Sequence, residues 1–393
     1  MKAEAAGRSS LRELAILVIG GGIGGLTSAI ALRQRAFAVT AIEKDPTWSV
    51  YGVGIIQQGN VLRAVDALGI LERYVDAGVG FDAVEVYAPD GTKLARVPSP
   101  RLLEAYPANL GISRPALQKV LADAAMSAGA ELRLGVTAEA IQDNEHAVHV
   151  RFSDGSEGRY DLVIGADGIH SQTRATVFPE AETPQFTGQA VWRYNLPRPA
   201  DLDAMHVYNG PTGVGLVPTS RDVMYMYVTT PEPGNPRHPT QGLAAQMRER
   251  VSNCAPEIRE LAKSITDDDE VVYRPLEALL VEGAWHKGRV VLLGDAIHAT
   301  TPHLGQGAGL AIEDSLVLAE ELATHATLGA ALTAYRQRRF ERCAYIVRAS
   351  LAICRGQLGQ GPPVDNARAT AEMFDRCVDD LPAENKAAAA ATA

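Results

Sequence analysis

The sequence has few cysteines and few aromatic residues, and both shortages exclude classes of protein. Only four cysteines occur among 393 residues, and none form a C-x-x-C pair. This excludes the disulfide framework of small secreted scaffolds and favours a reducing cytoplasm. No spacing of His, Cys and Asp is typical of a metal site, so we expect no metal. Aromatic residues make up 6% and apolar residues 46% of the chain, as in ordinary globular proteins.

Clusters of basic residues and long apolar runs are also missing. The 37 Lys and Arg residues are outnumbered by 47 Asp and Glu residues, which gives a formal net charge of -10. Nucleic-acid binding depends on clustered positive charge, so we expect no nucleic-acid partner. No run approaches the roughly 20 apolar residues that span a bilayer, so we expect no membrane segment. A signal peptide is a weak interpretation of the N-terminus, because Glu13 precedes the apolar stretch 14–19 and glycines then interrupt it.

The N-terminal pattern is that of a βαβ unit. Residues 14–19 and 38–43 are typical of short buried strands, and residues 22–35 of an apolar helix between them. Ala36 occupies the turn before the second strand, which costs little unless the turn needs a positive φ. Further helices are predicted at 60–68 and 115–128, and further strands at 131–136, 147–152, 158–160 and 162–164.

The composition changes between residues 183 and 283, where Pro, Gly and aromatic residues gather and residues 223–228 alternate as in an antiparallel strand. A buried strand returns at 290–293, followed by helical patterns. We therefore predict an α/β fold in which a discontinuous Rossmann-like domain is completed by a smaller antiparallel-sheet domain and C-terminal helices. The expected boundaries are 11–80, 100–182 and 284–360 for the first domain, 81–99 and 183–283 for the second, and 361–393 for a C-terminal helix and frayed tail.

A glycine motif opens the first predicted helix. Gly20-x-Gly22-x-x-Gly25 follows a strand, so its backbone N–H groups and the positive end of the helix can hold a pyrophosphate. Glu43 ends the second strand, where an acid accepts hydrogen bonds from ribose hydroxyls. Because a carboxylate there repels a 2′-phosphate, the tightly held dinucleotide is not expected to be NADP. On its own, the motif also fits a tight turn beside a surface glutamate.

Three further segments carry polar residues and glycines near predicted strand ends. Asp295 follows a buried strand and can accept hydrogen bonds from a polyol such as the ribityl chain of a flavin. Gly305, Gly307 and Gly309 allow backbone to approach a flat ring, and the helix that begins there supplies positive charge for a reduced, anionic flavin. The other two segments are 161–174, with Asp167-Gly168, and 112–121, with Ser113-Arg114-Pro115.

In order and spacing, these motifs resemble the single-component FAD-dependent aromatic hydroxylases, the group A flavoprotein monooxygenases that include 4-hydroxybenzoate, 3-hydroxybenzoate, salicylate and urate hydroxylases. The resemblance runs from residue 14 to about residue 355. It implies that Asp295 contacts the flavin ribityl chain, that Arg114 contacts FAD, and that the loop with Pro302 borders the flavin ring. Segment 51–60 resembles the stretch beside which that ring moves. The FAD-binding residues implied in this way are Gly20, Gly22, Gly25, Glu43, Lys44, Gly54, Arg114, Asp167, Asp295, Pro302, Gly305, Gly307 and Ala308.

The resemblance implies a monooxygenase that hydroxylates an aromatic or heteroaromatic ring with NAD(P)H and O2 through a flavin C4a-hydroperoxide. FAD is the expected cofactor, NADPH or NADH a transient co-substrate, and a small aromatic compound the substrate; a homodimer is left open. The residues expected to line the substrate are His303, Tyr225, Arg193 and Tyr208. Alternatives are a flavin-dependent halogenase, an oxidoreductase that does not activate oxygen, and a non-catalytic redox sensor. A halogenase is expected to carry W-x-W-x-I-P, whereas residues 192–197 are WRYNLP.

Overall fold

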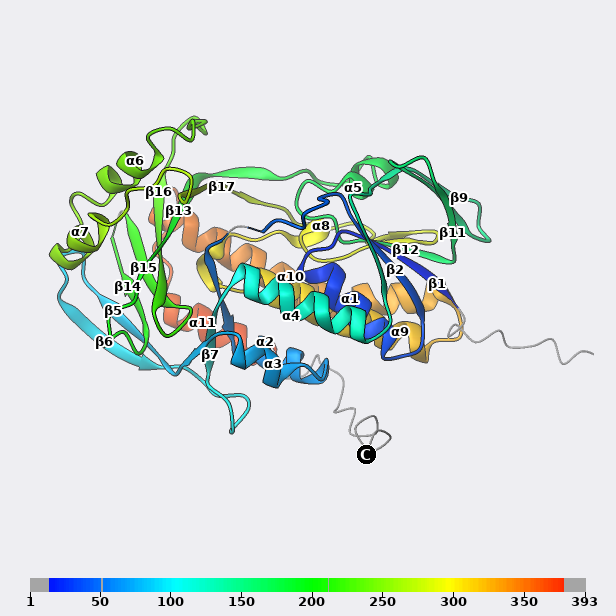
Figure 1. Ribbon diagram of the computed structural model, residues 1–393, viewed down its shortest axis with the longest axis horizontal. Helices are drawn as coiled ribbons and strands as arrows, with labels where there is room; N and C mark the ends of the chain where they lie inside the picture. Colours follow the sequence, from blue (N-terminus) through cyan, green and yellow to red (C-terminus); the bar gives the residue numbers. More distant parts are fainter. Residues whose placement is uncertain (1–13, 51, 211, 378–393) are drawn as a thin grey trace, which may run out of the picture.

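The computed structural model describes residues 14–50, 52–210 and 212–377, which form four sheets and the helices around them (Figure 1). Residues 11–13 and the predicted tail beyond residue 377 lie outside this part of the chain. The predicted α/β architecture is confirmed. No helix among the described residues is long and apolar enough to cross a membrane.

The first domain is built on a six-stranded sheet in the order β18-β19-β12-β1-β2-β8. The strands from β19 to β8 run parallel, and only the edge strand β18 is antiparallel. The central strands are almost wholly apolar because both faces of the sheet are covered. The bounds are β1 (Ala15–Ile19), β2 (Ala38–Glu43), β8 (Glu131–Leu134), β12 (Leu162–Gly165), β18 (His286–Lys287) and β19 (Val290–Leu292).

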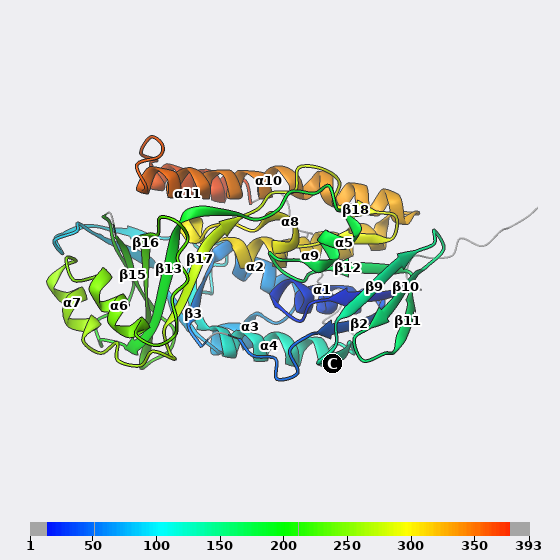
Figure 2. The same ribbon diagram turned by 90° about the horizontal axis from the view of Figure 1, so that it is seen from above.

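Helices cover the parallel sheet and share one large hydrophobic core with it. Helix α1 packs between α4 and α9, and α10 packs on α9. In Figure 2, α10 runs along one side of the molecule from the central sheet to the second domain. The bounds are α1 (Ile23–Arg33), α2 (Gly59–Ala67), α3 (Leu71–Asp76), α4 (Arg114–Ser127), α5 (Gln172–Val177), α8 (Asp295–His298), the 3-10 turn η2 (Pro302–Leu304), α9 (Gly307–Thr324), α10 (Leu328–Gln357) and α11 (Asn366–Asp375).

Ala36, in the turn between α1 and β2, was expected to cost little stability unless the turn needs a positive φ. This residue has a φ of 66°, in the left-handed region that disfavours residues with a Cβ atom. Since the turn does require a positive φ, the alanine carries backbone strain there.

The second domain is built on a seven-stranded sheet in the order β17-β13-β16-β15-β14-β5-β6. One face of this sheet packs on α6 and α7 through a separate core that includes Trp192, Tyr194 and Met226. The bounds are β5 (Ala83–Tyr87), β6 (Lys93–Pro98), β13 (Gln185–Pro197), β14 (Met205–Tyr208), β15 (Gly213–Pro218), β16 (Val223–Pro231), β17 (Val272–Ala278), α6 (Leu243–Arg250) and α7 (Pro256–Ala262).

Two small antiparallel sheets complete the fold, β11-β10-β9 at the end of the molecule opposite α6 and α7, and β3-β7-β4 between the two domains (Figures 1 and 2). The second of these sheets touches the seven-stranded sheet directly. A Cβ atom added at Gly111 of β7 would lie 1.8 Å from the carbonyl oxygen of Pro218. The bounds are β3 (Gly54–Gln58), β4 (Val79–Phe81), β7 (Asn109–Ser113), β9 (Ala138–Asp143), β10 (Val148–Phe152) and β11 (Glu157–Tyr160).

Candidate active site

The three glycines of the N-terminal motif have different surroundings. A Cβ atom added at Gly20 would lie 2.4 Å from Ala166 O, and one at Gly25 would lie 1.8 Å from Gly20 O. Gly20 also has a φ of 113°. A Cβ atom at Gly22 would meet nothing within 4 Å. The fold itself therefore requires Gly20 and Gly25, whereas the space above Gly22 is open to a molecule from outside the chain.

Helix α1 begins at this open space without a cap. Its N-cap residue Gly22 offers no side chain, and no acidic residue lies in the first turn. The first backbone N–H groups of a helix carry partial positive charge and need acceptors. A phosphate group satisfies both needs, so the start of α1 suits a pyrophosphate.

Glu43 at the end of β2 lies against the same turn. Its two carboxylate oxygens accept hydrogen bonds from Gly21 N at 2.8 Å and Asp45 N at 2.9 Å. A carboxylate has about four lone-pair sites, so acceptor capacity remains for ribose hydroxyls. Lys44 follows Glu43 and is exposed. Sequence reasoning missed Trp48, whose Nε1 donates to Gly21 O at 2.8 Å and whose φ is 54°.

Asp295 and Arg114 lie near one another at helix starts. Asp295 is the first residue of α8 and is accessible to solvent, yet the surrounding protein desolvates its carboxyl and raises its pKa. His298 and Arg114 oppose that rise. Arg114 begins α4 and is partly buried; desolvation lowers the pKa of its guanidinium, while Tyr225 and Asp295 act in the other direction. The starts of two helices from distant segments thus bring a carboxylate and a cation close together.

The loop after α8 is the one predicted to border the flavin ring. Pro302 is exposed at the start of η2, and Gly305 has a φ of 67°. Helix α9 then begins at Gly307, followed by Ala308, with no side-chain cap and no acidic residue in its first turn. The positive end of an 18-residue helix is therefore left for an electron-rich group.

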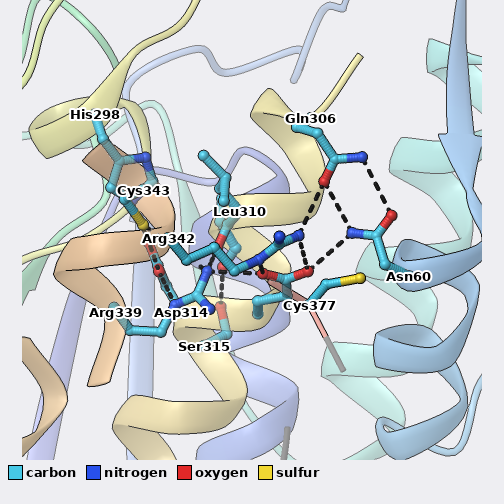
Figure 3. Close-up of polar contacts among 12 residues, drawn as sticks. Asn60, His298, Gln306, Leu310, Asp314, Ser315, Arg339, Arg342, Cys343 and Cys377 are labelled. Atoms are coloured by element: carbon cyan, nitrogen blue, oxygen red, sulfur yellow. Dashed lines mark hydrogen bonds and ion pairs between the residues drawn. The ribbon is translucent and has the colours of Figure 1, made fainter. Parts of the chain in front are cut away.

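A buried polar network beneath this loop was not predicted. Gln306 turns its side chain inward, where its Oε1 accepts from Asn60 Nδ2 at 2.9 Å and Arg342 Nη2 at 3.1 Å (Figure 3). Glu313 accepts from Asn60, Arg339 and Arg342. Burial raises the pKa of Glu313, but the two guanidinium groups outweigh it and lower that pKa to about 2. The network ties the loop to α2 and α10.

Three side chains beside this network have the atom types of a metal site. His298, Asp314 and Cys343 are buried, and their potential ligand atoms lie within 4.8 Å of one another. However, Asp314 already accepts from His298 Nε2 at 2.6 Å, Arg339 Nε at 2.8 Å and Gly294 N at 3.2 Å. A guanidinium in direct contact opposes a second cation, so these residues hold α8, α9 and α10 together.

The side chain of Asp167 stabilises its own loop. Its carboxylate accepts from the Ser171 hydroxyl and from Thr173 N at 2.9 Å, which closes the turn before α5. The preceding residue, Ala166, is the one that approaches Gly20. Asp167 therefore lies beside the glycine turn, with its carboxylate engaged within its own loop.

One face of the seven-stranded sheet carries polar side chains and lies against residues 52–54, part of the segment predicted to lie beside the flavin ring. On β13, Trp192 and Tyr194 belong to the core under α6 and α7, so Arg193 and Asn195 occupy the opposite face. Asn195 Nδ2 donates to Gly52 O at 3.0 Å. A Cβ atom at Gly54 would lie 2.4 Å from Tyr225 Cδ1. Residues 52–54 therefore pass directly over this face.

The four residues expected to line a substrate do not all lie together. Arg193 and Tyr225 interact electrostatically with each other and with Arg114. Tyr208 lies on the other face, where its ring stacks on Tyr87 at 4.6 Å. His303 lies toward α10, with Nδ1 bonded to Thr301 Oγ1 at 2.9 Å and Nε2 to Gln357 Oε1 at 3.0 Å.

Comparison with known proteins agrees with this geometry. Residues 13–350 match the family described as FAD binding domain. Aurachin C monooxygenase/isomerase of Stigmatella aurantiaca is 33% identical over 352 residues, covering 88% of this chain and 90% of that protein. 3-Hydroxybenzoate 6-hydroxylase of Polaromonas naphthalenivorans is 30% identical over 378 residues, covering 89% of each chain. The chain belongs to the FAD-dependent monooxygenases of this family.

A solved structure shows that the similarity extends over the whole fold of this monooxygenase. Klebsiella pneumoniae HpxO, solved with FAD and uric acid, superposes with a TM-score of 0.79 at 25% identity and covers 93% of this chain and 92% of its own. The predictions of an FAD cofactor and of monooxygenase activity are confirmed.

Proposed function

We propose that this monooxygenase hydroxylates an aromatic or heteroaromatic ring, with NADH or NADPH as electron donor and O2 as oxygen donor. Its relatives include proteins named for hydroxylating 3-hydroxybenzoate and 6-hydroxynicotinate. The observation that carries the proposal is that Arg114, which interacts with Asp295, also interacts with Arg193 and Tyr225. Arg114 thereby links the segments proposed to hold the flavin with the polar face of the seven-stranded sheet.

The residues present fit FAD along its whole length. The open space at Gly22 and the uncapped start of α1 suit the pyrophosphate, and Glu43 suits the ribose. Asp295 and Arg114 would hold the ribityl region, and Gly54, Pro302, Gly305 and Gly307 would border the ring. When bound, FAD supplies electron transfer from the pyridine nucleotide and activation of O2.

The chain's own residues would position the ring and control its protons. Tyr225 is surrounded by protein, and this desolvation raises the pKa of its hydroxyl, so at neutral pH it is a hydrogen-bond donor. Burial lowers the pKa of His303, only partly offset by its bond to Gln357, which keeps its imidazole neutral. With both ring nitrogens engaged, His303 is suited to holding the loop at Pro302 against α10 rather than to accepting a substrate proton.

The experiment that tests the proposal is a screen of ring compounds for faster NAD(P)H oxidation by the purified holoenzyme, with every product identified by mass spectrometry. We expect a product heavier by one oxygen atom. Faster NAD(P)H oxidation that yields only hydrogen peroxide for every compound would contradict ring hydroxylation.

A further inference from the structure

The loop at Pro302 and strand β13 of the seven-stranded sheet are connected through the end of α10. Gln357 is the last residue of α10, and its Oε1 atom accepts two hydrogen bonds. One comes from Gln189 Nε2 of β13 at 3.0 Å, and the other comes from His303 Nε2 of η2 at 3.0 Å. A single side-chain oxygen atom therefore joins the sheet to the loop proposed to border the flavin ring.

Gln189 is anchored on the sheet side of this connection. The residue is 1% exposed, and its Oε1 accepts from the thiol of Cys354, which precedes Gln357 on α10, at 3.3 Å. Gln189 shares a face of β13 with Arg193, because side chains four residues apart on a strand point the same way. A buried amide that loses a partner costs free energy, so the side chain of Gln189 is a fixed point for Gln357.

The bond to Gln357 also determines where His303 carries its proton. Since Gln357 Oε1 has no proton, His303 Nε2 must donate, and Nδ1 of a neutral imidazole is then an acceptor. This Nδ1 atom lies 2.9 Å from the hydroxyl of Thr301, which can donate to it. Burial lowers the pKa of His303, and the bond to Gln357 only partly offsets this, which agrees with a neutral ring. Both ring nitrogens are therefore engaged in holding η2.

We infer that Gln357 is a positioning residue, which sets the distance between the flavin loop and the sheet by binding His303 and Gln189 at the same time. The inference rests on the proposed function, in which the sheet positions the ring compound and the loop borders the flavin. Oxygen transfer between two groups depends on their separation, and a misplacement of about 1 Å can slow a reaction about 100-fold.

The fate of the oxygen atoms reports this separation. In ring hydroxylation, one atom of O2 enters the ring and the other leaves as water, while NAD(P)H and one proton are consumed. When the transfer is too slow, both oxygen atoms leave as hydrogen peroxide, and the same NAD(P)H and proton are consumed. The yield of hydroxylated product per NAD(P)H therefore measures positioning separately from the rate of NAD(P)H oxidation.

The test compares two replacements of Gln357 of similar length. This residue is exposed, so both variants should fold. Gln357→Met removes the acceptor, whereas Gln357→Glu keeps oxygen atoms that can accept from both donors. With the ring compound that most accelerates NAD(P)H oxidation, Gln357→Met should give about five-fold less product per NAD(P)H, with hydrogen peroxide making up the difference. Gln357→Glu should restore the yield, and Gln360→Met, at an exposed position nearby, should leave it unchanged.

Replacements of His303 separate positioning from proton transfer. His303→Gln keeps an N–H group near the position of Nε2 but cannot take up a proton, whereas His303→Leu has no donor. We expect the glutamine variant to keep the yield of product and the leucine variant to lose it. His303→Leu combined with Gln357→Met should be no worse than Gln357→Met alone, because both changes break the same connection.

Two measurements on the holoenzyme do not depend on turnover. Nitrogen-15 NMR, with the signals of His303 assigned by their absence from His303→Leu, should show a neutral imidazole with its proton on Nε2. The visible circular dichroism of bound FAD, which reports the surroundings of the flavin ring, should change in Gln357→Met and return to that of wild type in Gln357→Glu.

Several outcomes would overturn the inference: a wild-type yield and flavin spectrum in Gln357→Met, an equal loss in Gln357→Glu, loss of the yield in His303→Gln, or a proton on Nδ1 of His303. These outcomes leave the proposed function standing, because wild type still forms the hydroxylated product. Absence of that product from wild type with every ring compound would instead remove the proposed function, and the positioning role with it.

Discussion

Asn60 Nδ2 donates to Glu313 Oε1 over 2.9 Å, although 253 residues separate the two in the sequence. The same amide donates to Gln306 Oε1, the residue just before α9. One side chain at the start of α2 therefore fixes both the helix and the loop proposed to border the flavin ring. Asn60 thus joins the N-terminal part of the chain to the late loop, two segments that are both proposed to hold FAD.

Removing the charge of Glu313 should destabilise the whole FAD domain. Glu313→Gln leaves Arg339 and Arg342 buried without their carboxylate, which should lower the free energy of unfolding by about 3–5 kcal/mol. Chemical denaturation measures this directly. Glu341→Gln, the same change at an exposed position of α10, is the control. A loss below about 0.5 kcal/mol for Glu313→Gln would mean that the network is not stabilising.

The contribution of Glu313 should disappear in acid. Its pKa falls from 4.5 to about 2 on folding, so the stability that it provides is complete above pH 4.5 and is lost as pH drops toward 2. The melting-temperature gap between wild type and Glu313→Gln should therefore be constant near neutral pH and should narrow below pH 4.5. A gap that stays the same down to the acid limit would show that Glu313 is not ionised in the native protein.

Ala36→Gly should stabilise the monooxygenase. The left-handed conformation costs a residue with a Cβ atom about 1–2 kcal/mol, and glycine avoids that cost at the price of unfolded-state entropy. We expect a net gain of about 1 kcal/mol and a higher melting temperature. Ala128→Gly, at a helix end with a φ of -73°, should lose stability instead. No gain at Ala36 would indicate that the turn relaxes in solution.

Gly215→Ala should disturb the substrate side and spare the cofactor. The new Cβ atom would lie 2.1 Å from the Tyr227 ring, which must move away from its position beside Arg193. FAD content should be retained, while spectral changes on adding ring compounds should be lost. Gly283→Ala, where a Cβ atom meets nothing within 4 Å, serves as the control. Unaltered ligand binding in Gly215→Ala would place the substrate elsewhere.

Gly22→Asp should give a folded, colourless protein. The space at Gly22 accepts a side chain, so the variant should fold. A carboxylate at this position repels the pyrophosphate, which carries the same sign of charge, and competes with it for the positive start of α1. Circular dichroism should match that of wild type, and absorbance at flavin wavelengths should be absent after purification. Gly283→Asp should stay yellow. Retention of FAD by Gly22→Asp would remove the assignment of the pyrophosphate.

The sequence predicted those strands and helices whose apolar patterns and end signals lie within a few neighbouring residues. Strand β2 coincides with the predicted residues 38–43, because a short apolar run between a helix and an acidic end has few alternatives. It was harder to predict which side chains of a strand face the substrate, because a shift of one residue moves a side chain to the other face of the sheet. Tyr208, which was expected to line the substrate, instead contacts Tyr87 and belongs to the core under α6 and α7.

Long-range pairing could not be predicted in the same way. Arg339 and Arg342 lie about three and about four turns into α10, a helix whose charged residues resemble those of an exposed face. Only the packing of α10 on α9 brings them to Glu313. A sequence signal did exist, since the adjacent acids at 313–314 interrupt the apolar stretch 308–319 of α9. The small sheet β3-β7-β4 also escaped prediction, because its strands pair across distant segments.

The most direct test of the account follows the oxygen atom itself. The holoenzyme is supplied with NADH or NADPH, the ring compound that most accelerates oxidation of the pyridine nucleotide, and oxygen-18 gas, and the product is analysed by mass spectrometry. The proposed ring hydroxylation predicts a product that carries one labelled oxygen atom on its ring. A hydroxylated product without the label, whose new oxygen atom then comes from water, or labelled hydrogen peroxide with the ring compound unchanged, would contradict it.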